Sequence, residues 1–350
     1  MNSSRTLSTI SSYRRRVDQI RRQIVGQCGY EAAWLVPPMA LIEHLINRKQ
    51  ASEELVAMKS SGEISRQKLK ALEKHAFARA SWRQYKAAVL FVFEEDRSTA
   101  VDVALIEELD IAIQILRAES QSGCLRRTKR TSGMKLKGFP AKDFDAIVNY
   151  LQANIGTHRH ADALLKWLRA SRIVGVRPSE WRCGRLITVD GIAAVCFENA
   201  KTSNGRGNGK ERILLLDEAT SGDIDCIGDL LNMLNELQKD PAFDLGRFQL
   251  ALGSHMRYAT RRCLGKRSRY PTMYSLRHQF AADAKVCFSL EEVAALLGHG
   301  VDCTATTHYG RKAAAQSPLK VSPTPSQVAT VRRSPKSEFR PNQTPDLTPV

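Results

Sequence analysis

A basic, glycine-interrupted stretch near residue 130 divides this sequence and favours two separately folded parts over one. Residues 121–140 contain no acidic side chain, and Ser132, Gly133 and Gly138 lie within them. A like-charge run with this composition is typical of an exposed linker. The sequence therefore predicts one domain at residues 1–123, a linker at 124–138 and a second domain at 139–312. The basic residues of the linker are Arg126, Arg127, Lys129, Arg130, Lys135 and Lys137.

The first of these parts has only helical patterns. Ser81 is expected to cap a helix in which Val89, Leu90 and Phe93 follow at helical spacing. Residues 104–116 repeat apolar side chains with the same period. We therefore expect residues 1–123 to form an all-α domain.

The second part mixes helices with short strands. Apolar runs at 186–189, 194–197 and 213–216 are strand-like, and the turn-forming residues 203–209 join the last two as a hairpin. Helices are expected behind Pro140, and from a capping box at Ser289 and Glu292 to a left-handed C-cap at Gly298. Strands gathered inside a helical domain indicate an α+β class. The expected fold is thus mainly α, with a mixed second domain that carries a small antiparallel sheet.

After residue 312 the composition changes. Seven of the thirteen prolines lie between Pro318 and Pro349, among serine and threonine, with few large apolar side chains. Such a segment can bury little apolar surface. We expect residues 313–350 to be a disordered tail.

The charge of the chain points to a polyanionic partner. The sequence has 53 Lys and Arg against 36 Asp and Glu, a formal net charge of +17, and this favours nucleic acid before a membrane. No apolar run approaches the roughly 20 residues that span a bilayer. The eight cysteines include no CxxC pair, which argues against a zinc site and a disulfide framework and favours a reducing cytoplasm. No metal or cofactor is expected, and the linker is expected either to contact DNA phosphates or to serve only as a tether.

Four motifs follow one another in the second part. Arg177 lies in Gly-Val-Arg-Pro-Ser-Glu at 175–180, and Lys201 heads the predicted hairpin. Arg277 lies in Tyr-Ser-Leu-Arg-His at 274–278, and Leu-Gly-His at 297–299 precedes Tyr309. This order resembles the signature of the tyrosine recombinases, or phage-type integrases, over roughly residues 70–312. The resemblance implies a helical core-binding domain that clamps DNA and a catalytic domain of the DNA breaking-rejoining fold.

The resemblance also implies the reaction and its residues. Tyr309 would attack a DNA phosphate and form a 3′-phosphotyrosine, while Arg177 and Arg277 hold the non-bridging oxygens. Lys201 would protonate the leaving 5′ oxygen, and His299 would donate to a phosphate oxygen. Tyrosine has an ordinary pKa of about 10, so the proton of Tyr309 must leave as it attacks.

Each of these residues has a structural alternative. Arg177 could simply pair with Glu180 one helical turn later, and Lys210 could fill the role of Lys201. Arg277 could be an ordinary surface charge, although it lies in an otherwise apolar helix frame. His299 could be an ordinary residue after a helix, and Tyr309 an exposed tyrosine.

The chain departs from the family pattern in three ways. Tyr274 occupies the place of the histidine that helps with the nucleophile's proton, so His278 or His308 could be needed for it. The interval from His299 to Tyr309 is one residue longer than usual. The Pro-rich residues that follow differ from the C-terminal helix that many members dock onto a neighbouring protomer.

We expect a site-specific recombinase that integrates or excises a mobile element. By resemblance it acts on double-stranded DNA as a homotetramer on two sites, in the cytoplasm with the nucleoid, with accessory directionality factors as further partners. Two alternatives stay open. One is a DNA-binding relative that no longer cuts, and the other is a type IB topoisomerase-like enzyme acting on one duplex.

Overall fold

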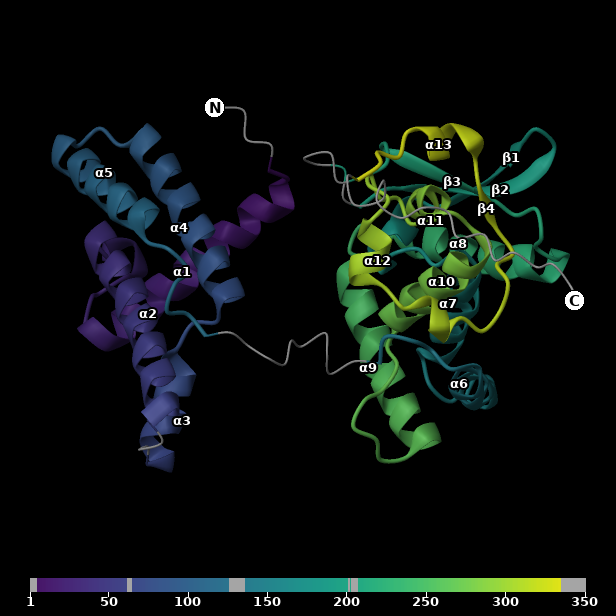
Figure 1. The fold of residues 1–350 in the computed structure, drawn as a ribbon, viewed down its shortest axis with the longest axis horizontal. Helices are drawn as coiled ribbons and strands as arrows, with labels where there is room; N and C mark the ends of the chain where they lie inside the picture. The colour runs from purple at the N-terminus through teal and green to yellow at the C-terminus, as the bar shows by residue number, and fades with distance from the viewer. Residues whose placement is uncertain (1–4, 62–64, 126–135, 201, 203–206, 335–350) are drawn as a thin grey trace, which may run out of the picture. The chain divides into compact units, whose positions relative to one another are not determined.

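The computed structural model describes residues 5–61, 65–125, 136–200, 202 and 207–334. The chain divides into two compact units, Met1–Arg130 and Thr131–Val350 (Figure 1). The expected linker at 124–138 spans this division. Of its six basic residues, Lys137 is described and exposed, and the other five lie outside the described residues.

The first unit is all helical in its described part. Its α-helices pack around a core to which α1, α2, α4 and α5 each contribute, with side chains such as Ile20, Leu45, Trp82, Phe93 and Ile113. Helix α4 lies between α1 and α5, and α2 contacts both α3 and α5. The helices are α1 (Leu7–Cys28), η1 (Ala33–Leu35), α2 (Pro38–Ser61), α3 (Arg66–His75), α4 (Arg79–Thr99) and α5 (Val103–Ala118).

The expected N-cap at Ser81 is wrong. Helix α4 begins three residues earlier than this cap implies, with Ala78 at the N-cap position. The backbone N–H of Arg79 donates to the carbonyl of Leu125, beside a bridge between Ala78 and Leu125. The carbonyl of Leu125 thus satisfies a backbone N–H at the start of α4 that a side-chain cap would otherwise satisfy.

The second unit is helical with one antiparallel sheet, so the expected fold class is confirmed. Helix α7 packs against α6, α8 and α10, while α11 lies beside β3 and β4 (Figure 1). Its helices are α6 (Ala141–Ala153), α7 (Ala161–Val174), η3 (Pro178–Cys183), α8 (Ser221–Gln238), α9 (Leu245–Leu264), α10 (Met273–Cys287), α11 (Leu290–Leu296), α12 (Thr304–His308), η5 (Lys312–Ala314) and α13 (Pro325–Ala329).

The sheet has the strand order β1-β2-β3-β4. Strands β1 (Arg185–Val189), β2 (Ile192–Glu198) and β3 (Glu211–Leu215) match the three predicted runs, and β4 (Ser322–Pro323) adds a short edge. Cys196 pairs with Ile213, and Leu214 pairs with Pro323. Asp190 and Gly191 both have positive φ, as the tight turn between β1 and β2 requires. The two predicted inner strands therefore form the expected hairpin.

The expectation of a disordered tail from residue 313 is wrong for residues 313–334. Residues 322–323 complete the edge of β3, where proline is tolerated because no further strand needs its missing N–H. Val321 is 1% exposed, and Val331 packs with Ala294 and Ala295 of α11. Val321 and Val331 thus anchor this segment, although Ala313, Ala314 and Ala329 are exposed. Residues 335–350 lie outside the described part of the chain.

Candidate active site

Tyr309 lies at the end of a very short helix and points into the second unit. Helix α12 has five residues, and Tyr309 is its C-cap. The ring of Tyr309 packs between His278 and His299, with 5.2 Å between its centroid and each of theirs. The phenol is therefore enclosed by the very segments that the sequence motifs singled out.

Arg277 holds the phenol oxygen of Tyr309. Its Nε donates to that oxygen at 3.1 Å, and its guanidinium carbon lies 5.2 Å from the centre of the tyrosine ring. The side chain is 1% exposed and comes from the first half of α10. Its Nη1 and Nη2 donate to the carbonyls of Gly175 at 3.0 Å and Leu297 at 2.6 Å. The guanidinium is thus fixed by three elements of the unit, and Nε faces the phenol.

Tyr274 is the second partner of that phenol. The two hydroxyl oxygens, one from the first turn of α10 and one from Tyr309, lie 3.2 Å apart. Burial raises the pKa of Tyr309, but the charge of Arg277, the hydrogen bond from Tyr274 and the charge of Arg177 outweigh it and lower the pKa to about 8. Burial and the neighbouring Tyr309 raise the pKa of Tyr274 to about 12. Tyr309 is therefore the phenol that ionises first, and its phenolate accepts the hydrogen bond from Tyr274.

Arg177 lies at the N-cap of η3 and is paired with Glu180. The carboxylate accepts from the backbone N–H of Arg177 at 2.7 Å and from its Nη1 at 2.5 Å. The ion pair between Arg177 and Glu180, which the sequence analysis gave as the structural alternative, is therefore present in the structure. It does not remove Arg177 from the site, because Glu180 also lies 3.8 Å from Nη1 of Arg277. One carboxylate connects both arginines of the predicted pair.

Arg212 is a third guanidinium that the sequence analysis missed. Its side chain is fully buried on β3, donating to Glu180 at 2.5 Å and to Asn199 at 2.6 Å. Burial raises the pKa of Glu180, but Arg212 first, then Arg277 and Arg177, hold it well below its usual range. The sequence did contain a signal, since alternation along the strand puts Arg212 on the same face as Leu214. A cation at such a position needs an anionic partner.

The cluster carries an excess of positive charge. Three guanidiniums, those of Arg177, Arg212 and Arg277, surround the single carboxylate of Glu180. His299 adds no charge, because burial and then these arginines lower its pKa to about 2. Three guanidiniums against one carboxylate leave the cluster beside the phenol of Tyr309 with two uncompensated positive charges. Such a site favours a ligand or transition state that carries negative charge.

His299 lies beside Arg277 because the chain turns sharply before it. Nε2 of His299 is 3.5 Å from Nη2 of Arg277. Arginine only donates, so the proton of the imidazole is on Nδ1, which has no hydrogen-bond partner among the described residues. Gly298 has a φ of +64°, and a Cβ on it would collide with Asn199 and Arg212. Glycine at this position is thus required by both the backbone and the space.

Residues 327–332, in the C-terminal segment, form hydrogen bonds with two loops near this site. The side chain of Asn208, at the base of the β2–β3 connection, donates to the carbonyl of Gln327 at 2.8 Å and accepts from Thr330 at 2.7 Å. Further along, the backbone of Arg332 pairs with Gly300, just after His299. The segment therefore connects the hairpin to the loop that carries the histidine.

Two further predictions concern residues that the structure does not place. Lys201 lies outside the described residues, and so does the side chain of His308. Lys210 is exposed at the base of β3, where its carbonyl accepts from Asn199 at 2.8 Å. The choice between Lys201 and Lys210 therefore stays a prediction.

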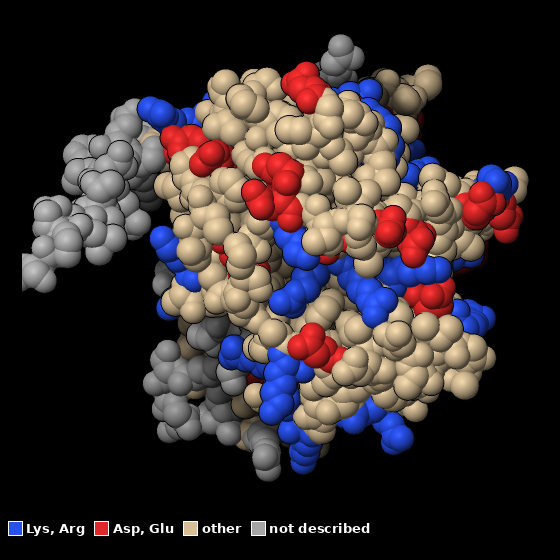
Figure 2. Space-filling model, turned by 90° about the vertical axis from the view of Figure 1, so that its right-hand side faces the viewer, with Lys and Arg blue, Asp and Glu red and all other residues tan. Residues whose placement is uncertain are grey.

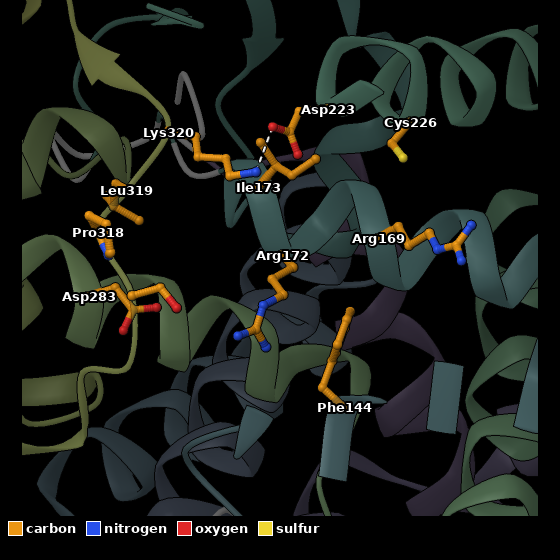
Figure 3. Close-up of a pocket in the computed structure, with 11 residues that line it drawn as sticks. Phe144, Arg169, Arg172, Ile173, Asp223, Cys226, Asp283, Pro318, Leu319 and Lys320 are labelled. Atoms are coloured by element: carbon orange, nitrogen blue, oxygen red, sulfur yellow. Dashed lines mark hydrogen bonds and ion pairs between the residues drawn. The ribbon is translucent and has the colours of Figure 1, made fainter. Parts of the chain in front are cut away.

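Outside this cluster, the described part of the second unit has cavities lined by side chains of both charges, and two of them share Arg169 and Cys226. A cavity of about 260 Å³ lies between α6, α7, α8, α10 and residues 317–320, and none of its lining residues belongs to the cluster around Tyr309. Figure 3 shows Arg172 and Phe144 on one side and the ion pair of Lys320 with Asp223 on the other. Figure 2 shows basic side chains gathered across one face of the molecule with acidic ones between them. The cavity is therefore a separate feature from the Tyr309 site.

No metal cluster or membrane span accompanies the site in the described residues. No group of three or more His, Cys, Asp or Glu side chains there could hold a metal ion. None of the helices described is long and apolar enough to cross a membrane.

Comparisons with known proteins return solved recombinase structures. No family description and no curated protein matches the sequence. A dimer of lambda integrase residues 75–356 bound to a COC′ core site is 14% identical, covering 91% of this chain and 94% of that one, with a TM-score of 0.43. XerH site-specific recombinase in a pre-cleavage complex with difH is 13% identical, covering 79% and 95%, with a TM-score of 0.38.

A third solved structure is a lambda integrase tetramer bound to a Holliday junction. It is 17% identical, covers 85% of this chain and 86% of that one, and has a TM-score of 0.36. Because these TM-scores lie below 0.5, the likeness by itself assigns no activity to this chain.

Proposed function

We propose that this chain is a site-specific DNA recombinase that cuts and rejoins DNA through a 3′-phosphotyrosine on Tyr309. The observation that carries the proposal is the 3.1 Å hydrogen bond from Arg277 Nε to the phenol oxygen of Tyr309. It unites two motifs that lie 32 residues apart in the sequence. A buried arginine beside a nucleophilic oxygen is what an attack on a phosphate anion requires.

The excess charge of the cluster suits the transition state of phosphoryl transfer. A DNA phosphodiester carries one negative charge, and attack by a phenolate brings a second. The two uncompensated positive charges of Arg177, Arg212 and Arg277 against Glu180 match this doubly charged state. Arg177 and Arg277 would hold the two non-bridging oxygens, and Nδ1 of His299 would donate a further hydrogen bond.

The reaction balances with groups of the chain and water. With a pKa of about 8, about one Tyr309 in ten is a phenolate at pH 7, against about one in a thousand for an ordinary tyrosine. Water takes the proton, and Tyr274 stabilises the phenolate by its hydrogen bond. The Tyr309 oxygen bonds to phosphorus as the bond to the 5′ oxygen breaks, and Lys201 protonates that oxygen. Rejoining reverses these steps on a new 5′ hydroxyl.

Cleavage would occur in cis, which means that one chain supplies both the nucleophile and the arginines. Tyr309 already contacts Arg277 of its own chain at hydrogen-bond distance. The one rearrangement then needed is that Nε of Arg277 exchanges its hydrogen bond to the phenol for one to a phosphate oxygen. In a mixture of the Tyr309→Phe and Arg277→Ala proteins, we therefore expect no covalent adduct.

Binding would use the first unit and the linker in addition to the site. Lys137 is exposed, and the linker residues Arg126, Arg127, Lys129, Arg130 and Lys135 are proposed to contact phosphates. Affinity should then fall with salt, and alanine substitutions in the linker should flatten the slope. The working form is proposed to be a homotetramer on two DNA sites that integrates or excises a mobile element, with accessory directionality factors as further partners.

The decisive experiment is adduct formation on a nicked duplex. Duplexes from a random-sequence pool that the full-length protein retains would be nicked just 3′ of the cut position, so that the freed fragment diffuses away and rejoining stops. A denaturing gel should show a protein–DNA adduct with the unaltered chain and none with Tyr309→Phe. An adduct that fails to exchange strands with a second duplex would favour a topoisomerase-like enzyme, and no adduct would favour a non-cutting DNA-binding protein.

A further inference from the structure

Lys285 ties the segment that carries Tyr309 to helix α10. Its Nζ donates to the carbonyl of Ala305 at 3.0 Å and to the carbonyl of Gly310 at 2.6 Å. These two carbonyls lie on either side of Tyr309 in the sequence, one in α12 and one just after it. One ammonium group thus spans the turn from which the phenol projects.

Gly310 gives the same turn a second anchor on α10. A Cβ at this position would lie 2.6 Å from the carbonyl oxygen of His278 and 3.2 Å from Cβ of Ala282. The backbone at Gly310 therefore packs directly on the helix, at a distance that only glycine permits. Lys285 lies one turn beyond Ala282 on the same helix, so the two anchors are adjacent.

The turn depends on such anchors because α12 is weak by itself. It has five residues, and no side chain caps its N-terminus. A helix of one turn is not stable in isolation, because nucleation costs more than so few hydrogen bonds return. Burial of Lys285 lowers the pKa of its ammonium, so holding it there costs free energy that the two carbonyl bonds must offset.

We infer that Lys285 is a positioning residue, which holds the Tyr309 turn against Arg277 and so keeps the nucleophile of each chain at its own arginine pair. This inference rests on the proposed function, because it assigns Lys285 a part in the attack of Tyr309 on DNA. Lys285 touches neither the phenol nor Arg277 and acts through the backbone carbonyls of Ala305 and Gly310.

The test compares Lys285→Met with a matched control. Methionine keeps the apolar stem of lysine and removes only the ammonium. The control is Lys86→Met in the first unit, where Lys86 also donates to two carbonyls, of Arg117 and Glu119, at 3.0 and 2.6 Å. Both full-length variants would be assayed for adduct formation on the nicked duplex at saturating concentration. A misplacement of the nucleophile by about 1 Å can cost on the order of 100-fold in rate.

The second readout follows the phenol itself. The absorbance of Tyr309 phenolate, taken as the difference between each protein and its Tyr309→Phe counterpart, is titrated against pH. In the unaltered chain and in Lys86→Met, Tyr309 should titrate near a pKa of about 8. In Lys285→Met the pKa should return toward 10, because the phenol loses its hydrogen bond from Arg277. General loss of stability would not produce this shift in a protein that stays folded.

The expected pattern is a fall of 10- to 100-fold in adduct rate for Lys285→Met, unchanged DNA affinity, and partial recovery in Lys285→Arg. If Lys285→Met does not fold, Gly310→Ala tests the same turn by pushing it away from His278, with the same expected shift of the Tyr309 titration. Normal adduct rate and an unshifted titration in these variants would overturn the role of Lys285. An unaltered chain that forms no adduct would instead overturn the proposed function, and the titration would still test the anchor.

Discussion

Replacing Glu180 with glutamine should destabilise the second unit strongly, although the side chain keeps its shape. The substitution removes one negative charge from a position where the side chains of Glu180 and Arg212 are fully buried and that of Arg277 is 1% exposed. Three guanidiniums then lie together without a counter-charge. Breaking a buried ion pair by removing one partner costs about 3–5 kcal/mol in free energy of unfolding.

The expected fall in melting temperature follows from the size of the unit. For a domain of 150–250 residues, 1 kcal/mol corresponds to about 2–4 °C, and the second unit spans Thr131–Val350. Glu180→Gln should thus lower its melting temperature by roughly 6–20 °C at neutral pH. The matched control is Glu211→Gln on the same sheet, whose partner Arg185 is half-exposed. That control should change the melting temperature little, because exposed ion pairs contribute little.

The pH dependence gives this prediction a sign. The folded-state pKa of Glu180 is held below its usual range, so its contribution is complete above the unfolded value of about 4.3 and is lost as the pH falls through the folded value. The difference in melting temperature between the unaltered chain and Glu180→Gln should therefore be constant from pH 8 to about 5 and shrink below about 4. Calorimetry over this range measures it. A difference that matches the Glu211→Gln control, or one that grows in acid, would refute the role given to this carboxylate.

Three further perturbations test the site. Arg277→Lys should lower the adduct rate by about 100-fold or more with DNA affinity within about tenfold, because one ammonium cannot replace the guanidinium fork; normal cutting would make Arg277 structural. Tyr274→Phe removes the hydrogen bond that helps to lower the pKa of Tyr309, so the midpoint of the adduct rate against pH should move upward. An unchanged midpoint would show that Tyr274 does not influence the ionisation of Tyr309. Gly298→Ala should lower the melting temperature, since alanine both strains a positive φ and collides with Arg212; an unchanged value would contradict the packing.

Local sequence patterns predicted much of the second unit correctly. The β2–β3 hairpin follows from two apolar runs around a turn-forming segment, and both strands lie where expected. Ser289 and Glu292 form the capping box, and Gly298 has the positive φ expected after that helix. These features depend on neighbours within a few residues, so the sequence contains most of the information that determines them.

The features that sequence reasoning missed depend on distant partners. The start of α4 is decided by Leu125, far along the chain, and not by the cap at Ser81. The order in residues 313–334 comes from the open edge of β3, which composition cannot reveal. The buried role of Glu180, which lies in η3, requires Arg212 from strand β3, so only the pair with Arg177 was visible in the sequence.

The most direct measurement of the central claim is to identify the residue that becomes linked to DNA. The adduct formed on the nicked duplex would be digested with nuclease and protease, and the nucleotide-bearing peptide sequenced by mass spectrometry. Because the Tyr274 oxygen lies only 3.2 Å from that of Tyr309, the two phenols are the candidates to separate. We expect the nucleotide on Tyr309, the phenol with the lower pKa. A nucleotide on Tyr274 or on any other residue would contradict the account.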